Sequence, residues 1–191
     1  MRITGGTAGG RRLLAPRTEA RPTQDRVREA LFNIVGARIV GARFLDLFAG
    51  SGAVGIEAWS RGAKSVAWVE SDRRALACLR ENARALGVSA PAIVPVSVDR
   101  FLKKPQNFLA VSEFDIIFAD PPYGKTEWRE RLADGVRLGG ALAPGGMWIM
   151  EAARASHETS LRGWRLDDAR QYGATRLLFY RAAVADATEG A

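Results

Sequence analysis

The chain has few of the side chains that build disulfides and metal clusters. Its 191 residues include one cysteine, Cys78, and one histidine, His157. A single thiol cannot form an internal disulfide or a cysteine-based metal cluster, and a single imidazole excludes sites built from several histidines. We therefore expect no metal, and a catalytic triad is disfavoured.

Long apolar runs are also missing. No stretch approaches the roughly 20 apolar residues that a membrane-spanning helix needs. The N-terminus is rich in arginine and glycine and has no apolar segment of the kind found in signal peptides. These features predict a cytoplasmic protein with no membrane partner.

Basic charge is concentrated at one end of the chain. The formal net charge is +7, and residues 1–43 contain nine arginines but only three acidic residues. The rest of the chain is close to neutral. Clustered arginine suits a polyphosphate partner, because the guanidinium group carries positive charge and binds phosphate through two hydrogen bonds. A solvated basic tail is the alternative, but the charge favours nucleic acid.

Length and patterning predict one domain over residues 1–182, followed by a disordered tail at 183–191. Residues 1–40 are expected to form a basic arm with a small hairpin and a helix at 24–36. From residue 43 onwards, short apolar strands alternate with amphipathic helices. This alternation predicts an α/β core over residues 43–182, with a seven-stranded, mostly parallel, Rossmann-like sheet covered by helices on both faces.

The expected elements follow this pattern closely. Strands are expected at 44–48, 65–70, 92–98, 114–119, 147–152, 165–172 and 174–182, with a turn at 144–146 before the fifth strand. Helices are expected at 53–61, 72–86, 126–138 and 158–161, and a short helix and loop at 99–108. Ligands of such sheets bind beyond the carboxyl ends of the strands. Asp46, Glu70, Asp99 and Asp120 all fall at those ends. We expect one crevice to gather all four.

A glycine-rich turn follows the first core strand. Residues 50–55 read GSGAVG and match the G-x-G-x-x-G pattern, in which glycines permit a tight turn and the close approach of a ligand. Glu70 lies 20 residues after Gly50, where an acid can bind ribose hydroxyls. This pattern suits either a dinucleotide or S-adenosylmethionine, because both contain an adenosine ribose.

Two details favour S-adenosylmethionine. Asp46 lies four residues before Gly50, where a carboxylate would repel a pyrophosphate but could orient the ammonium group of a methionine. The turn also has no basic residue nearby for phosphate. Asp99 could accept a hydrogen bond from the adenine amine, and it could equally cap the helix that follows it.

The most informative motif is Asp120-Pro121-Pro122-Tyr123, which follows an apolar strand. The two prolines fix the backbone and remove two N–H donors. A carboxylate, carbonyl oxygens and an aromatic ring remain at the strand end. These groups suit an exocyclic amine on a nucleobase, whereas a structural Pro-Pro turn with a partly buried tyrosine is the alternative.

Together, the segment from Asp46 to Gly52 and the Asp120–Tyr123 motif resemble class I methyltransferases that act on exocyclic amines. The N-terminal sequences MRITGG, GRRL, RPT and DRVREALFNI are more specific. They resemble the bacterial 16S rRNA (guanine(966)-N(2))-methyltransferase family over about residues 1–182. The resemblance implies S-adenosylmethionine as donor and a guanine of 16S rRNA, either as naked rRNA or in the assembling small ribosomal subunit, as acceptor. We expect the protein to act as a monomer.

The resemblance also implies roles for individual residues. The donor would be bound by Asp46, Phe48, Gly50, Gly52, Glu70 and Asp99. Asp120, Pro121, Pro122 and Tyr123 would form the catalytic motif, in which Asp120 and the Pro121 carbonyl accept hydrogen bonds from the guanine amine and Tyr123 stacks on the base. Four arginines, namely Arg11, Arg12, Arg26 and Arg28, would hold rRNA phosphate.

Three other functions fit parts of the sequence. The motif at residues 120–123 would also serve a DNA adenine-N6 or cytosine-N4 methyltransferase, although no separate target-recognition domain is present. The glycine-rich turn alone would fit a nicotinamide-dependent oxidoreductase. The basic arm would fit a non-catalytic RNA-binding or assembly protein.

Overall fold

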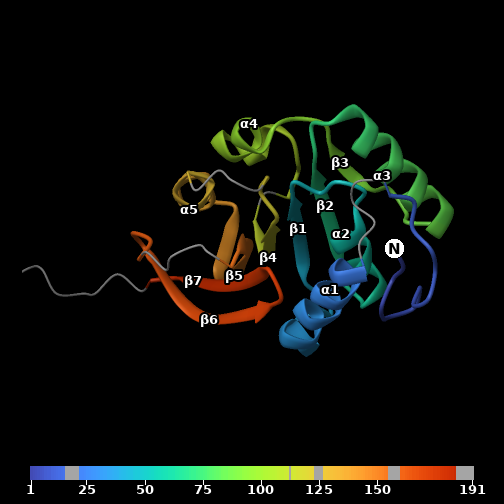
Figure 1. Cartoon of the computed structure of the whole chain (residues 1–191). Helices are drawn as coiled ribbons and strands as arrows, with labels where there is room; N and C mark the ends of the chain where they lie inside the picture. The colour runs from blue at the N-terminus through green and yellow to red at the C-terminus, as the bar shows by residue number, and fades with distance from the viewer. Residues whose placement is uncertain (16–21, 112, 123–126, 155–159, 184–191) are drawn as a thin grey trace, which may run out of the picture.

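A computed structural model describes residues 1–15, 22–111, 113–122, 127–154 and 160–183. Its centre is a seven-stranded sheet with the strand order β3-β2-β1-β4-β5-β7-β6 (Figure 1). The strands are β1 (Arg43–Leu47), β2 (Ser65–Val69), β3 (Ala92–Val94), β4 (Phe114–Ala119), β5 (Leu142–Ala153), β6 (Trp164–Tyr172) and β7 (Thr175–Ala182). The first five strands in this order, from β3 across to β5, run parallel, whereas β7 is antiparallel to both β5 and β6. The sheet is therefore mixed, because the last two strands form a hairpin.

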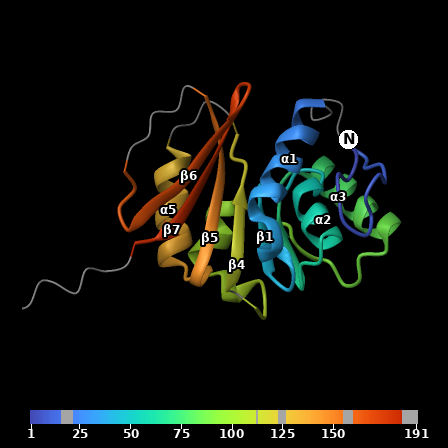
Figure 2. The same ribbon diagram turned by 90° about the horizontal axis from the view of Figure 1, so that it is seen from below.

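Helices cover both faces of the sheet (Figure 2). One apolar core joins α1 (Pro22–Val35), α2 (Ala53–Ser60) and α3 (Arg73–Leu86) to one face, and a second joins α4 (Val98–Lys103) and α5 (Trp128–Leu138) to the other. The 3₁₀ helices η1 (Gly36–Ile39) and η2 (Pro105–Asn107) complete the elements. Successive strand residues alternate between the cores, so Phe44 faces α1–α3 and Leu45 faces α4–α5.

Two strand boundaries differ from the sequence prediction by four residues or more. Strand β3 ends at Val94, four residues early. Pro95 follows directly and has no N–H to donate to the neighbouring strand. Strand β5 begins at Leu142, before the expected turn at residues 144–146, and the register with β4 shifts there. Residues 158–159 of the expected helix at 158–161 and residues 184–191 of the expected tail lie outside the described residues, and Ser160 and Leu161 are not helical.

The expected N-terminal hairpin arm is not confirmed. Residues 1–15 contain a single isolated antiparallel bridge, between Arg2 and Arg12. The segment packs onto the core, because Ile3, Ala8 and Leu13 are buried in it. It also passes very close to α2. A Cβ atom at Gly6, where φ is +78°, would lie 2.0 Å from the backbone oxygen of Ser60, so only glycine fits there.

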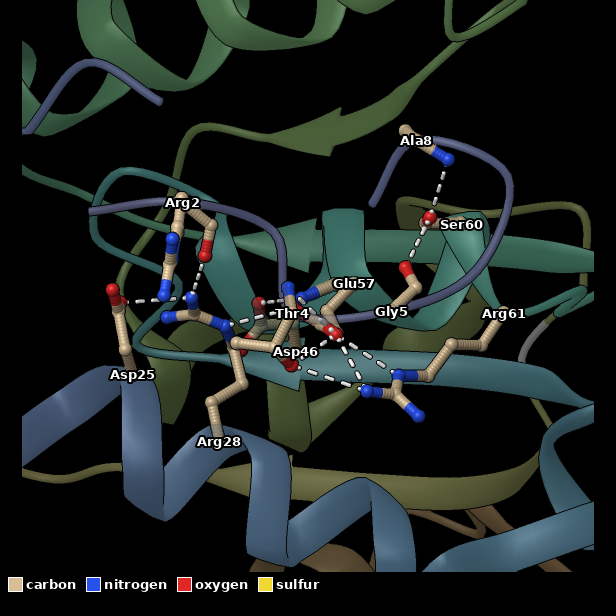
Figure 3. Close-up of polar contacts among 11 residues, drawn as sticks. Arg2, Thr4, Gly5, Ala8, Asp25, Arg28, Asp46, Glu57, Ser60 and Arg61 are labelled. Carbon is tan, nitrogen blue, oxygen red and sulfur yellow. Dashed lines mark hydrogen bonds and ion pairs between the residues drawn. The ribbon is translucent and has the colours of Figure 1, made fainter. Parts of the chain in front are cut away.

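A buried carboxylate on α2 joins this segment to α1 (Figure 3). Glu57 is fully buried. Its oxygens accept hydrogen bonds from the backbone N–H of Thr4 at 2.9 Å, from Nε of Arg28 at 3.0 Å and from Nε of Arg61 at 2.9 Å. The Thr4 hydroxyl donates a further bond of 2.6 Å. Three segments that are distant in sequence therefore meet at one side chain.

Within the described ranges, no helix combines the length and the apolar character needed to cross a bilayer.

Replacing Glu57 by glutamine should destabilise the protein strongly. The substitution leaves the buried guanidinium of Arg28 without its carboxylate on α2, and breaking a buried ion pair costs about 3–5 kcal/mol. Urea unfolding would measure the change. Glu81→Gln is the matched control, because Glu81 pairs with Arg84 on the exposed surface of α3 and should matter little. Equal, small changes in both variants would contradict the structural role of Glu57.

Candidate functional site

The carboxyl ends of the parallel strands border one cavity of about 510 Å³. Asp46, Glu70, Asp99 and Asp120 all line it, as the alternation of strands and helices predicted. Their order across the cavity follows the strand order, since Asp99 comes after β3, Glu70 after β2, Asp46 from β1 and Asp120 after β4. Tertiary structure thus brings together carboxylates that are up to 74 residues apart.

Glu70 holds the glycine-rich turn in place. Its Oε2 accepts a hydrogen bond of 2.8 Å from the backbone N–H of Gly50. Its Oε1 accepts from the backbone N–H groups of Ser71 and Asp72 at 2.6 and 2.7 Å. A carboxylate has about four acceptor positions, so these three bonds leave capacity for a ligand hydroxyl.

Two of the motif glycines are explained by packing. A Cβ atom at Gly52, where φ is +80°, would lie 2.0 Å from Cδ1 of Leu79. At Gly55 it would lie 2.2 Å from Nε1 of Trp68. These glycines let α2 approach β2 and α3. Gly50 lines the cavity, whereas Gly52 is not among its lining residues.

Asp46 is a nearly fully buried acid, with 1% of its surface exposed. It lies on the α2 side of β1, where its Oδ2 accepts a hydrogen bond of 2.8 Å from the backbone N–H of Gly55. Burial raises the pKa of the Asp46 carboxyl to about 7, and the nearby charge of Glu70 adds to the increase, while the Gly55 hydrogen bond opposes it. A cationic ligand in the cavity would favour the charged form of Asp46.

One alternative predicted that Asp99 caps the helix after β3, but it does not. The N-cap of α4 is Ser97, whose hydroxyl accepts a hydrogen bond from the backbone N–H of Arg100. Asp99 lies in the first turn of α4, and its Oδ2 lies 2.6 Å from Nη2 of Arg131 on α5. Asp99 still lines the cavity, and this ion pair links α4 to α5 beside it.

The Asp120 motif begins where β4 ends. The backbone N–H of Asp120 donates to the carbonyl of Leu47 at 3.4 Å, which holds the motif beside β1. Asp120 and Pro122 line the cavity, and Pro121 is not among its lining residues. Tyr123 lies outside the described residues. Two aromatic residues lie nearby, since Trp128 lines the cavity and packs edge-on against Phe48, with ring centroids 4.9 Å apart.

The four arginines predicted to bind phosphate do not share one environment. Arg11, Arg12 and Arg26 are exposed. Arg28 is different, because only 4% of its surface is exposed and its guanidinium is paired with Glu57 and Asp25. The burial of Arg28 therefore argues against the predicted contact between this residue and rRNA phosphate. The sequence places it two residues after the exposed Arg26 on α1, but its own helix face turns towards the core.

The chain is similar to known proteins over most of its length. The sequence profile of the family described as "Conserved hypothetical protein 95" matches residues 1–181. The protein named Ribosomal RNA small subunit methyltransferase D is 43% identical over 127 residues in Haemophilus influenzae and 40% identical over 124 residues in Escherichia coli K12. These matches span 64% of this chain, and 64% and 60% of the two relatives. The chain therefore covers less than two thirds of the length of these curated relatives.

One solved structure extends this similarity to the whole fold. The Escherichia coli protein yhhF superposes with a TM-score of 0.82 at 30% identity, covering 97% of this chain and 99% of that one. The chain belongs to the ribosomal RNA small subunit methyltransferase D family of class I methyltransferases.

Some cavity residues of this family member were not expected from sequence. Met1, Gln24 and Leu31 bring the N-terminal segment and α1 to the cavity wall, and Ser97 and Glu151 line it elsewhere. Among the described residues, Oε1 of Gln24 is buried without a hydrogen-bond partner. The helical spacing at 24–36 predicted an apolar face, but no sequence signal indicated that this face borders the site.

The raised pKa of Asp46 predicts a pH-dependent penalty on folding. Between about pH 4 and about pH 7, folded Asp46 retains a proton that the unfolded chain has released, so its contribution to stability falls as pH rises. Asp46→Asn should remove this penalty. Urea unfolding should show the variant gaining stability relative to the unsubstituted protein between about pH 5 and about pH 8. A difference that does not change with pH would contradict the raised pKa.

Proposed function

We propose that this protein transfers a methyl group from S-adenosylmethionine to the exocyclic N2 amine of a guanine in 16S rRNA. One observation carries the proposal, namely a single cavity lined by the strand-end acids Asp46, Glu70 and Asp99 and, beside them, by Asp120 and Pro122. Family membership supports methyl transfer, and the names of the relatives support ribosomal RNA of the small subunit as the substrate class.

The cavity fits the proposed donor. Its volume of about 510 Å³ falls in the usual range for small-molecule sites, which is about 300–1,000 Å³. Five carboxylate side chains line it among the described residues, but only one arginine or lysine does. This balance suits a sulfonium and an ammonium group and disfavours the pyrophosphate of a dinucleotide. Glu70 would hold the ribose, and Val96, Val98 and Asp99 would surround the adenine.

S-adenosylmethionine supplies an electrophilic methyl group on a sulfonium sulfur. The protein has to present the amine correctly, because the amine lone pair is delocalised into the guanine ring. Asp120 and the Pro121 carbonyl would accept hydrogen bonds from the two N–H groups of the amine and turn its lone pair towards the methyl group. Residues 121 and 122 are both prolines, so neither has a backbone N–H that could compete for these acceptors. Positioning and electrostatics then account for the rate.

The target base must leave its stack to reach the cavity. Tyr123 is proposed to stack on the extruded base, which would offset about 1–3 kcal/mol of the extrusion cost. Trp128 borders the same cavity and offers a second aromatic surface. Unpaired guanine is therefore the expected form of the substrate.

An exposed basic surface would hold the rRNA backbone. Arg11, Arg12 and Arg26 contribute from the N-terminal segment and α1. Helix α3 extends this surface, because Arg11 donates a hydrogen bond of 3.1 Å to the carbonyl of Ala85 near the end of α3. Three exposed arginines lie on one stripe of that helix, at positions i, i+7 and i+11: Arg73, Arg80 and Arg84.

Asp120→Ala should abolish most methyl transfer while S-adenosylmethionine still binds. The substitution removes an acceptor for the guanine amine and leaves the proposed donor contacts at Asp46 and Glu70 intact. Transfer of labelled methyl would be measured on small subunits from cells that lack the protein, with naked 16S rRNA and duplex DNA in parallel, and donor binding by calorimetry. Unchanged transfer would refute the role of Asp120. Transfer to duplex DNA alone would favour a DNA amine methyltransferase instead.

Charge reversal at Arg11 and Arg12 should weaken RNA binding without affecting the donor. We expect a higher KM for the small subunit, an unchanged S-adenosylmethionine affinity, and a salt dependence of binding that falls by about one unit of slope for each lost phosphate contact. The matched control reverses Arg165 and Arg170, which are exposed on β6. Equal effects of the two double variants would show that only net charge matters.

A further inference from the structure

Arg28 is a buried cation held on three sides. Its Nε donates to Oε2 of Glu57 at 3.0 Å, and its Nη2 donates to Oδ1 of Asp25 at 3.0 Å and to the backbone carbonyl of Arg2 (Figure 3). A guanidinium group is planar, so these contacts fix its orientation. The side chain is therefore positioned before any ligand arrives.

The same side chain keeps unused donors beside the cavity. A guanidinium has five N–H groups, and the contacts to Glu57, Asp25 and Arg2 use three of them. Within the described part of the chain, the two N–H groups of Nη1 have no hydrogen-bond partner. Arg28 lines the cavity that holds the proposed donor site. Nη1 is not among the fully buried unpaired atoms, so it keeps accessible surface, and an anionic ligand group in the cavity would accept its hydrogen bonds.

Arg28 and Asp46 reach the cavity near the same turn of α2. Arg28 contacts Glu57, and Asp46 accepts a hydrogen bond from the backbone N–H of Gly55. Gly55 and Glu57 are two residues apart, which is about 3 Å along a helix axis. A fixed cation and a buried acid that line the same cavity together match the carboxylate and ammonium groups of an α-amino acid.

We propose that Nη1 of Arg28 binds the carboxylate of the donor's methionine moiety, while Asp46 binds its ammonium group. This inference rests on the proposed function, because it concerns the donor. An RNA phosphate is a poorer occupant, since Arg28 is only 4% exposed and the N-terminal segment covers it through the carbonyl of Arg2. A small ligand bound in the cavity would lie beside Arg28, because Arg28 lines it.

The test compares two ligands that differ only in the carboxylate. S-adenosylhomocysteine carries both the ammonium and the carboxylate, and its decarboxylated analogue keeps the ammonium alone. Calorimetry on the full chain should show that the unsubstituted protein prefers S-adenosylhomocysteine by about 10- to 100-fold, the usual range for a hydrogen bond to a charged group. Arg28→Gln should remove most of this preference and leave the affinity for the analogue nearly unchanged.

Arg61→Gln is the matched control. Arg61 also donates to Glu57, but it is not among the residues that line the cavity. It should keep the full preference. Arg28→Lys is the second variant, chosen because a lysine can replace the contact with Glu57 and preserve folding, but has no second amino group to offer the ligand. It too should lose most of the preference, and thermal unfolding would confirm that each variant is folded.

Each contrary outcome has a distinct meaning. A full preference in folded Arg28→Gln or Arg28→Lys would overturn the assignment of the carboxylate to Arg28. An equal loss of affinity for both ligands would also overturn it, because Arg28 would then act only through the structure of the cavity wall. If the unsubstituted protein bound neither ligand, the proposed donor itself would be refuted. Tight binding with no preference would refute only the role of Arg28.

Discussion

The buried carboxylate of Glu57 is the contact on which the rest of the site depends. It receives hydrogen bonds from the N-terminal segment, from α1 and from its own helix, and it has no exposed surface. Met1, Gln24, Arg28 and Leu31 line the cavity from the two segments that it secures. Without this anchor, one wall of the cavity would lose its polar contacts with α2 and be held only by apolar packing. Burying a charged pair has a large desolvation cost, but its directional hydrogen bonds fix how the N-terminal segment and α1 are positioned against α2.

The other wall follows from parallel strand packing. Strands β3, β2, β1 and β4 all end at one edge of the sheet. Each of them brings one carboxylate to the cavity, either from the strand itself or from the residues that follow it. Glu70 then fixes the turn after β1 through the backbone N–H of Gly50, so neighbouring strand ends are tied together. The result is a strongly acidic cavity with one arginine. That balance of charge supports a cationic donor. The position of Arg28 in the cavity lining supports its proposed contact with the carboxylate of the donor's methionine moiety.

Several individual residues gained a different explanation from the structure. The G-x-G-x-x-G pattern indicated close approach by a ligand, but Gly52 and Gly55 are required by Leu79 and Trp68. Both explanations predict glycine, so the pattern could not separate them. Arg28 and Arg26 are neighbours in a basic segment, yet one is buried and the other exposed. Local charge could not distinguish them, because the difference depends on which helix face meets α2.

Much of the fold was determined by local sequence. The alternation of apolar strands and amphipathic helices predicted seven strands and the main helices, because most of the strands carry a short apolar run and the helices an apolar face. The strand ends also located the four carboxylates of the cavity. Local pattern was less informative where backbone chemistry intervenes, as at Pro95, which ends β3 early, and at residues 144–146, where β5 continues through an expected turn. Only the tertiary structure decided that the N-terminal segment forms part of the cavity wall and that Arg28 faces inward. These features depend on contacts such as Arg28 with Glu57, 29 residues apart, and Thr4 with Glu57, 53 residues apart, which no local spacing encodes.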